Sequence, residues 1–127
     1  KVSAEELAFL SGKEDLEAGA RHLWHPDLRL LIVTLGKDGC TYVTPRFSGT
    51  VATFAVKPVD TTGAGDGFVA GLLKGLVEHP QADRDEDRLR GICRYANAVG
   101  ALTTTRRGAI PALPTARQVS RFLRSRS

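Results

Sequence analysis

Apolar positions follow a helical period in some parts of the chain and a strand period in others. Leu16, Ala20 and Leu23 recur at helical spacing, which predicts an amphipathic helix that ends before Pro26. Residues 30–35 form a short, wholly apolar run. Such a run, bounded by turn residues, is typical of a parallel strand that is buried on both faces of a sheet. The chain therefore begins with helical structure and then enters a sheet.

Two further strands are predicted after a tight turn at residues 36–39. The first covers residues 40–44. The second covers residues 49–56, where the side chains alternate between two sides, and Pro58 argues against a central position in the sheet beyond that point. Strands that alternate with helices indicate an α/β layered domain, for which we expect a mostly parallel central sheet.

The later part of the chain is mainly helical. An apolar helix follows residue 67, and its small residues Ala70, Gly71 and Gly75 would let another element approach closely. A polar loop then leads to a long helix over about 86–102, whose inner stripe is apolar. This inner stripe consists of Leu89, Ile92, Cys93, Ala96, Val99 and Gly100.

Two capping boxes define helix starts at the two ends of the chain. In each, a hydroxyl residue is followed three positions later by Glu or Gln: Ser3 with Glu6, and Thr115 with Gln118. Gly12 ends the first helix. We therefore expect one helix after Ser3 and another after Thr115 with Val119, Phe122 and Leu123 on its inner face.

The composition fits one globular domain. The chain has 127 residues, of which 42% are hydrophobic and 25% charged. It has no apolar run of about 18 residues and no secretory signal, so we expect no membrane span and an intracellular protein. The two cysteines, Cys40 and Cys93, lie in apolar patterns far apart, which predicts buried, reduced thiols.

The positive charge is concentrated at the C-terminal end. The net charge is +4, and no Asp or Glu follows Asp87. Nucleic-acid binding is one interpretation, but only Phe122 interleaves with the arginines. A solvated helix face that attracts anions is the preferred interpretation. The arginines concerned are Arg106, Arg107, Arg117, Arg121, Arg124 and Arg126.

The most informative stretch is residues 60–68, where small residues separate a strand from a helix. Gly63, Ala64 and Gly65 place little bulk over the backbone. The first N–H groups of a helix lack internal partners and carry positive partial charge, so they form an anion-binding site. Asp66 lies at the same helix start. Its carboxylate could accept a proton from an attacking hydroxyl during phosphoryl transfer, in which positioning dominates catalysis.

Residues 60–68 have other interpretations. Asp66 could be a helix cap in a glycine-rich turn and nothing more. Residues 65–70 match the loose G-x-G-x-x-A dinucleotide pattern, but that site also needs an acidic residue at the end of a strand about 20 positions later. The corresponding region is a polar loop without a preceding strand. A Walker phosphate loop is absent from the sequence.

At residues 60–66 the sequence Asp-Thr-Thr-Gly-Ala-Gly-Asp resembles the second signature of the ribokinase-like (PfkB) carbohydrate kinases. Residues 34–39 resemble the nucleotide-loop motif of that family. Residues 96–101 and 107–115 are similar to the fructokinase branch, notably the plant-type enzymes. The resemblance extends to about Leu123. It implies a ribokinase-like fold, of which residues 1–127 would be the C-terminal nucleotide-binding and catalytic portion.

The resemblance also implies roles for individual residues. Asp66 would be the base that deprotonates a sugar's primary hydroxyl, and Gly63, Ala64 and Gly65 would form the anion hole. ATP would be the co-substrate, bound by residues of the nucleotide loop and the long helix. These ATP-binding residues would be Thr34, Gly36, Gly39, Asn97 and Gly100.

Two metal sites are implied as well. A monovalent cation, usually K⁺, would be held by Asp60 and the Thr62 carbonyl, joined by carbonyls near Thr103, Arg106 and Gly108. The family's Asn-x-x-Glu motif assists Mg²⁺ placement. Here Glu6 matches the motif, whereas Ser3 departs from it, and the capping box explains the same two residues.

The resemblance implies ATP-dependent phosphorylation of fructose at O6. Another sugar or nucleoside is the alternative within the family. A non-enzymatic fructokinase-like partner of organellar transcription machinery is a second alternative. The family's N-terminal half, with its sugar contacts and lid, has no counterpart here, so we predict that the isolated chain folds poorly and is inactive. We expect the full-length protein to be a cytoplasmic homodimer, with the plastid as another possible compartment.

Overall fold

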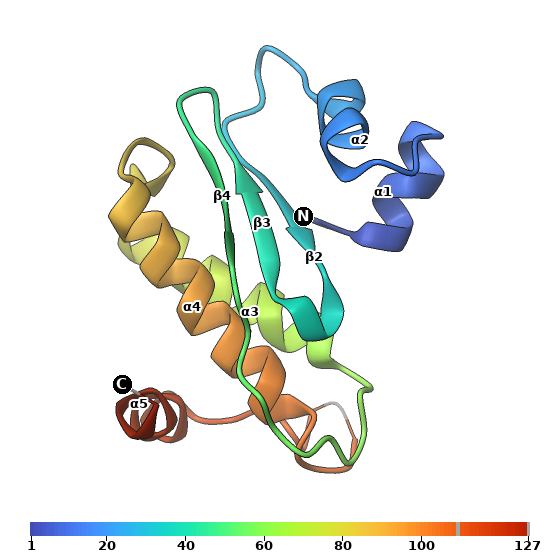
Figure 1. Cartoon of the computed structure of the whole chain (residues 1–127). Coiled ribbons are helices and arrows are strands. Elements are labelled where there is room, and N and C mark those ends of the chain that lie inside the picture. Colours follow the sequence, from blue (N-terminus) through green and yellow to red (C-terminus); the bar gives the residue numbers. More distant parts are fainter. Residues whose placement is uncertain (109, 127) are drawn as a thin grey trace.

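The computed structural model describes residues 1–108 and 110–126, which form an α/β structure. In chain order the helices and strands are β1 (Val2–Ser3), α1 (Ala4–Ser11), α2 (Leu16–Leu23), β2 (Leu31–Thr34), the 3₁₀ helix η1 (Gly36–Asp38), β3 (Cys40–Val43), β4 (Ser48–Val51), α3 (Ala64–Glu78), the 3₁₀ helix η2 (Ala82–Arg84), α4 (Glu86–Thr103) and α5 (Ala116–Ser125). The longest connections between helices and strands are the segment between β4 and α3 and the segment between α4 and α5 (Figure 1).

The sheet is mixed, with the strand order β1-β2-β3-β4 among the described residues. β1 pairs with β2 in parallel, with Ser3 opposite Thr34. The β2–β3 and β3–β4 pairs are antiparallel, because each is joined by a short turn. The α/β class is confirmed. The apolar pattern of residues 30–35 had indicated a mostly parallel sheet, but in this portion of the sheet only the β1–β2 pair is parallel among the described residues.

Helices cover both faces of the sheet (Figure 1). Successive residues of β2 point to opposite faces, so Leu31 and Val33 pack in a core with residues of α1 and α2. Ile32 packs on the other side, in a core that contains Cys40 and Tyr42 of β3 and residues of α3 and α4. A third cluster joins α4 to α5 around Val119. The predicted layered arrangement is therefore present.

Glycines bring α3 and α4 into close contact. A Cβ added at Gly71 would lie 2.9 Å from the Cα of Ala96, and one added at Gly75 would lie 2.6 Å from the Ile92 side chain. These two glycines have the predicted role. Ala70 does not, because it is exposed, and Gly67 takes its place in the contact, where a Cβ would meet the Thr103 hydroxyl at 2.5 Å.

Both predicted capping boxes are present. Ser3 N–H donates to Glu6 Oε1 at 2.7 Å and Glu6 N–H donates to Ser3 Oγ at 3.1 Å. At the start of α5, Thr115 N–H donates to Gln118 Oε1 at 2.7 Å and Gln118 N–H donates to Thr115 Oγ1 at 3.2 Å. These bonds satisfy donors that a helix start leaves unpaired.

The strand predicted over residues 49–56 is shorter in the structure and ends at Val51. Val51 pairs with Cys40, the first residue of β3. Before Cys40 the chain turns through η1, so no strand backbone lies opposite residues 52–56. That segment leaves the sheet and runs past its lower end before it returns into α3 (Figure 1).

Cys40 and Cys93 are both fully buried and free, as predicted. They lie in the core between β3 and α4. Within residues 1–108 and 110–126, no helix has the length and apolar character needed to cross a membrane.

Candidate functional site

A cleft of about 600 Å³ lies at the end of the sheet where η1, the segment after β4, and helices α3 and α4 meet. Its volume is within the range of small-molecule binding sites. It contains residues from each part of the chain that the family resemblance had marked for ATP or for the anion hole. These are Thr34, Gly36, Gly39, Ala64, Gly65, Asn97 and Gly100. Residues up to 66 positions apart in the sequence therefore share one cavity.

Gly39 forms one wall through its backbone. It has φ 93° and ψ −132°, a conformation that residues with a side chain adopt only with strain. A Cβ at this position would lie 2.0 Å from the carbonyl oxygen of Val51. Glycine thus allows the turn after β2 to approach β4 closely, and Leu35 N–H donates to the Gly39 carbonyl at 2.8 Å to close the turn.

Asn97 and Gly100 of α4 also line the cleft. Asn97 is 4% exposed, and its Nδ2 donates to the carbonyls of Val51 at 3.1 Å and Ala52 at 3.3 Å. Its amide therefore satisfies β4 carbonyls at the point where strand pairing stops. A Cβ at Gly100 would lie 3.2 Å from the carbonyl oxygen of Ala64, so this glycine lets α4 lie against the start of α3.

The start of α3 presents backbone donors to the cleft. Gly63 is the N-cap, with φ 82° and no side-chain cap. Ala64 N–H donates to the Thr61 carbonyl at 3.2 Å, and Gly67 N–H begins the helical pattern by donating to the Gly63 carbonyl at 2.8 Å. The N–H groups of Gly65 and Asp66 have no acceptor within the helix, because they belong to its first turn. They are the groups best placed to bind an anion.

Asp66 is the third residue of α3 and its side chain is exposed. The structure thus places this carboxylate one residue from Gly65, which lines the cleft. A negative charge in the first turn is favourable in the field of the helix. The position therefore fits a helix-stabilising carboxylate and equally a carboxylate that faces a reacting group beside the anion site.

Asp60 ties the loop before α3 to the loop after α4. Its Oδ1 accepts from Thr62 N–H at 2.9 Å and its Oδ2 accepts from Gly108 N–H at 3.0 Å. The Thr104 carbonyl accepts from the N–H groups of Val59 at 2.7 Å and Asp60 at 3.0 Å. Hydrogen bonds from the side chain and backbone of Thr62, followed by the bond from Gly108, hold the pKa of Asp60 below its usual value.

The residues expected around a monovalent cation are thus partly brought together. Asp60, Thr62 and Gly108 meet in this junction. Thr103 is fully buried and its hydroxyl donates to the Val99 carbonyl at 2.7 Å, whereas Arg106 is exposed. Carboxylate oxygens are ligands that hard cations prefer, and the junction contains the Asp60 carboxylate, whose two oxygens accept the N–H groups of Thr62 and Gly108.

Glu6 is committed to the capping box of α1. The hydrogen bond from the Ser3 backbone N–H is the main cause that lowers the pKa of this carboxyl. In the part of the chain that the structure describes, no three His, Cys, Asp or Glu side chains are grouped as a metal site. The capping-box interpretation of Ser3 and Glu6 therefore has direct geometric support.

Several residues that line the cleft were missed in the sequence, among them Lys37, Phe54 and Phe68. Lys37 lies in η1 between two residues that had been assigned to nucleotide binding, so its position in the turn was an available signal. Phe54 had been assigned to a strand, which concealed its place in a cavity wall. Phe68 had been assigned only to the apolar face of a helix, and it does pack in the core beneath the sheet as well as lining the cleft.

Comparison with known proteins gives a consistent set of relatives. The family model described as "pfkB family carbohydrate kinase" matches residues 1–116. "Probable fructokinase-3" of Arabidopsis thaliana is 54% identical over 125 residues, which are 98% of this chain and 36% of that protein. "Fructokinase-2" of Solanum lycopersicum is 52% identical over 125 residues, or 98% of this chain and 38% of that protein. The chain thus spans little more than a third of the length of these relatives.

Solved structures resemble this chain over almost all of its length. A fructokinase from Vibrio cholerae O395 with fructose, ADP and calcium ion bound has a TM-score of 0.87 and 40% identity, over 96% of this chain and 40% of that one. A fructokinase from Xylella fastidiosa with bound ATP has a TM-score of 0.90 and 31% identity, over 98% and 42%. The aminoimidazole riboside kinase of Salmonella enterica, complexed with aminoimidazole riboside and an ATP analog, has a TM-score of 0.81 and 35% identity, over 97% and 42%.

Proposed function

Since this chain belongs to the pfkB family of carbohydrate kinases, we propose that the protein that contains it transfers the γ-phosphoryl group of ATP to the 6-hydroxyl of fructose. The observation that carries the proposal is the start of α3. There the unpaired N–H groups of Gly65 and Asp66 and the Asp66 carboxylate lie together beside a cleft of about 600 Å³. The plant and bacterial relatives named as fructokinases support fructose as the acceptor.

The proposed mechanism uses the chain's own groups. The Gly65 and Asp66 N–H groups bind the transferring phosphoryl group and stabilise the charge that develops on it. Asp66 accepts the proton of the sugar's 6-hydroxyl while the new O–P bond forms. The bond between the γ-phosphorus and the bridging oxygen breaks, and ADP leaves with that oxygen. A carboxylate is a weak base, but positioning supplies most of the catalysis in phosphoryl transfer.

Metal ions belong to the proposal. Mg²⁺ would neutralise phosphate charge and keep most of its ligands as water and phosphate oxygens. K⁺ would lie at the junction of Asp60, Thr62 and Gly108, where it would order the loop that leads into α3. The relative from Vibrio cholerae has been solved with calcium and, as a double mutant, with potassium ion, which supports a cation in this family.

The test is a coupled assay of ADP release on the full-length protein with fructose, glucose and ribose, each with and without K⁺. We expect turnover with fructose, stimulated by K⁺. Asp66→Asn should lower kcat by about 10²–10⁴-fold. The matched control is Asp87→Asn, which also removes a carboxylate from the first turn of a helix but lies at the opposite end of α4 from Asn97 and Gly100, which line the cleft.

Either variant could lose helix stability, but only Asp66→Asn should lose turnover. Equal effects of the two substitutions would support a capping role for Asp66 and contradict the proposed base. A folded wild-type protein that turns over no sugar would favour the non-catalytic partner of transcription machinery. Turnover with a riboside in place of fructose would favour the second candidate, which the similarity to the aminoimidazole riboside kinase supports.

A further inference from the structure

The wall of the cleft after β4 is held by side chains and not by strand pairing. Residues 52–58 lie outside the sheet. Asn97 binds the carbonyls of Val51 and Ala52 at the start of this segment, and Thr53 Oγ1 donates to the Asn97 carbonyl at 3.5 Å. The next residues, Phe54 and Ala55, line the cleft. What fixes these two residues therefore fixes the shape of the cavity.

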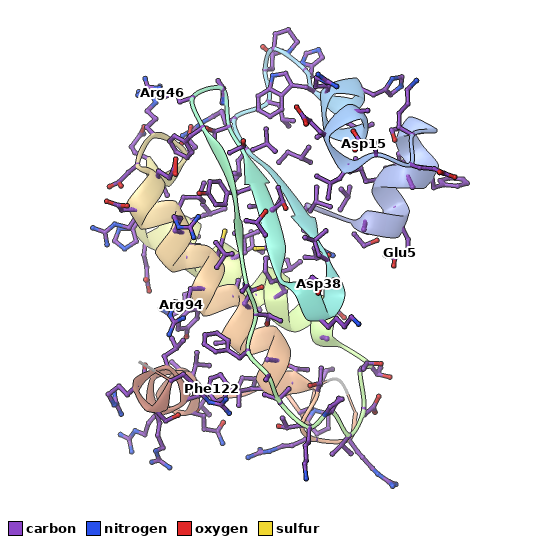
Figure 2. The ribbon with its side chains drawn as sticks, viewed as in Figure 1. Glu5, Asp15, Asp38, Arg46, Arg94 and Phe122 are labelled. Atoms are coloured by element: carbon purple, nitrogen blue, oxygen red, sulfur yellow. The ribbon has the colours of Figure 1, made fainter. Side chains whose placement is uncertain are left out.

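Side chains from two helices, α4 and α5, contact Phe54 from outside the cleft. The guanidinium carbon of Arg94, on α4, lies 4.8 Å from the centre of the Phe54 ring. The ring of Phe122, on α5, meets the ring of Phe54 edge to face, with centroids 5.1 Å apart and an interplanar angle of 74°. Arg94 and Phe122 are labelled on the same side of the molecule in Figure 2. Aromatic and cation–π contacts of this kind are each favourable.

Arg126 contacts Ala55, the residue after Phe54. Its guanidinium carbon lies 4.8 Å from the centre of the Phe122 ring, and its Nη1 donates to the carbonyl of Ala55 at 3.3 Å. The C-cap residue of α5 thus contacts the backbone of the cleft wall directly. Phe122 and Arg126 together couple this helix to Phe54 and Ala55.

The two ends of the cleft differ in chemistry. The end at α3 offers the Gly65 N–H group, with Lys37 also on the lining. The wall after β4 is mainly apolar: Phe54, Ala55, Val56 and Pro58. A nucleotide whose phosphates occupy the donor end would direct its base toward this apolar wall, since apolar and aromatic surface is what a planar base buries well.

We infer that Phe54 is the base-contacting residue of the nucleotide site and that Phe122 of α5 is a positioning residue that holds Phe54 in place. This inference rests on the proposed function, because it assumes that the cleft binds ATP. It gives the C-terminal helix a part in nucleotide affinity, although α5 itself contributes no residue to the cleft among the described residues.

The test separates binding of the base from binding of the phosphates. In the full-length protein, Phe122→Leu should raise the KM for ATP and the Kd for ADP by about 3- to 10-fold, the value of one aromatic pair. Inhibition by inorganic tripolyphosphate, the KM for fructose and kcat should stay within about twofold of wild type, as for a contact made only to the base. Phe54→Leu should also raise the KM for ATP and the Kd for ADP, and the ADP affinity of the double variant should be no worse than that of the weaker single variant.

Two further variants keep the outcome decisive. Thr115→Ala removes the side-chain cap at the start of α5, seven residues before Phe122, and so weakens the helix without changing the ring pair. It should lower the Tm and leave ADP affinity unchanged. Arg126→Ala changes an exposed side chain, so the protein should fold, and it should weaken ADP binding in the same direction as Phe122→Leu.

Direct titration with ADP requires no turnover, so the inference can be tested even if the proposed reaction is wrong. Unchanged ADP affinity in folded Phe122→Leu would overturn it. Equal losses for ADP and tripolyphosphate, or equal losses in Phe122→Leu and Thr115→Ala, would also overturn it, because they would indicate general loosening of the domain.

Discussion

Asp60 shows how one carboxylate can join two loops that the sequence separates by 48 positions. Both of its oxygens accept backbone N–H groups, from Thr62 and Gly108. Because hydrogen bonds stabilise the ionised form, the pKa of Asp60 is lower in the folded state than in the unfolded chain. Its contribution to stability is therefore complete above the unfolded pKa of about 3.9 and is lost as the pH falls through the lower folded value.

We predict that Asp60→Asn lowers the Tm of the full-length protein by a few degrees at pH 7. The new amide would direct N–H groups toward one of the two backbone donors, so one hydrogen bond would be lost. The difference from wild type should shrink as the pH falls below about 4. Thermal unfolding between pH 3 and 7 would measure it. Glu14→Gln, at an exposed carboxylate, is the control and should leave the Tm unchanged.

A difference between wild type and Asp60→Asn that stayed constant down to pH 3 would contradict this account. The sequence could predict that Asp60 mattered, because it opens a recognisable signature. It could not predict the bond to Gly108, which depends on where α4 ends relative to the loop. For the same reason the sequence identified Gly39 as a turn residue but gave no sign of its contact with Val51.

At the scale of elements, the contact between α3 and α4 depends on the absence of side chains along one stripe. A Cβ at Gly71 would meet backbone, which cannot move aside as a flexible side chain would. Gly91 is also a glycine inside a helix, but a Cβ there would have nothing within 4 Å. The two positions therefore differ in packing while they share the same intrinsic cost of glycine in a helix.

We predict opposite signs for the two substitutions to alanine. Gly71→Ala should destabilise the protein by about 1–3 kcal/mol through overpacking. Gly91→Ala should stabilise it by about 0.5–1 kcal/mol, because alanine is the better helix former. Urea denaturation of the full-length protein would measure both. Stabilisation by Gly71→Ala would show that the two helices can move apart at little cost.

The types and approximate ends of most elements could be predicted, since both capping boxes and the apolar stripes of α2, α4 and α5 are local signals. The limits of β4 could not. Alternation continues to residue 56 in the sequence, but a strand also needs a partner, and β3 supplies none beyond Cys40. The prediction that β2 is a parallel strand was right for its pairing with β1 and wrong for its pairing with β3, because a buried apolar run does not record which strands flank it.

At the scale of the molecule, several large apolar side chains remain exposed. Phe9 is 88% exposed on α1 and Val77 is 78% exposed on α3. The two-residue strand β1 also stands at one edge of the sheet. These features agree with a chain that spans 36% to 38% of the length of its relatives.

We predict that residues 1–127 alone self-associate and have no sugar kinase activity. Apolar surface that the rest of such a protein would cover should drive association, and an open sheet edge adds to the risk. Size-exclusion chromatography, dye binding and the coupled assay would measure these properties. A monomeric fragment that unfolds cooperatively and turns over fructose would contradict the prediction.

The rate at which the buried thiols react with an alkylating reagent should report how often the core opens. Cys40 follows Gly39 in sequence, Cys93 lies one helical turn before Asn97, and both sulfurs are shielded from solvent. The hydrogen bond with Cys40, together with burial, raises the pKa of the Cys93 thiol, which further slows its reaction. An alkylating reagent should therefore modify this pair only when β3 separates from α4. If ADP binds only the folded state, saturating ADP should lower the rate of that modification, and the decrease should grow with the fraction of protein that has ADP bound. Peptide mass spectrometry would follow the modification of each cysteine.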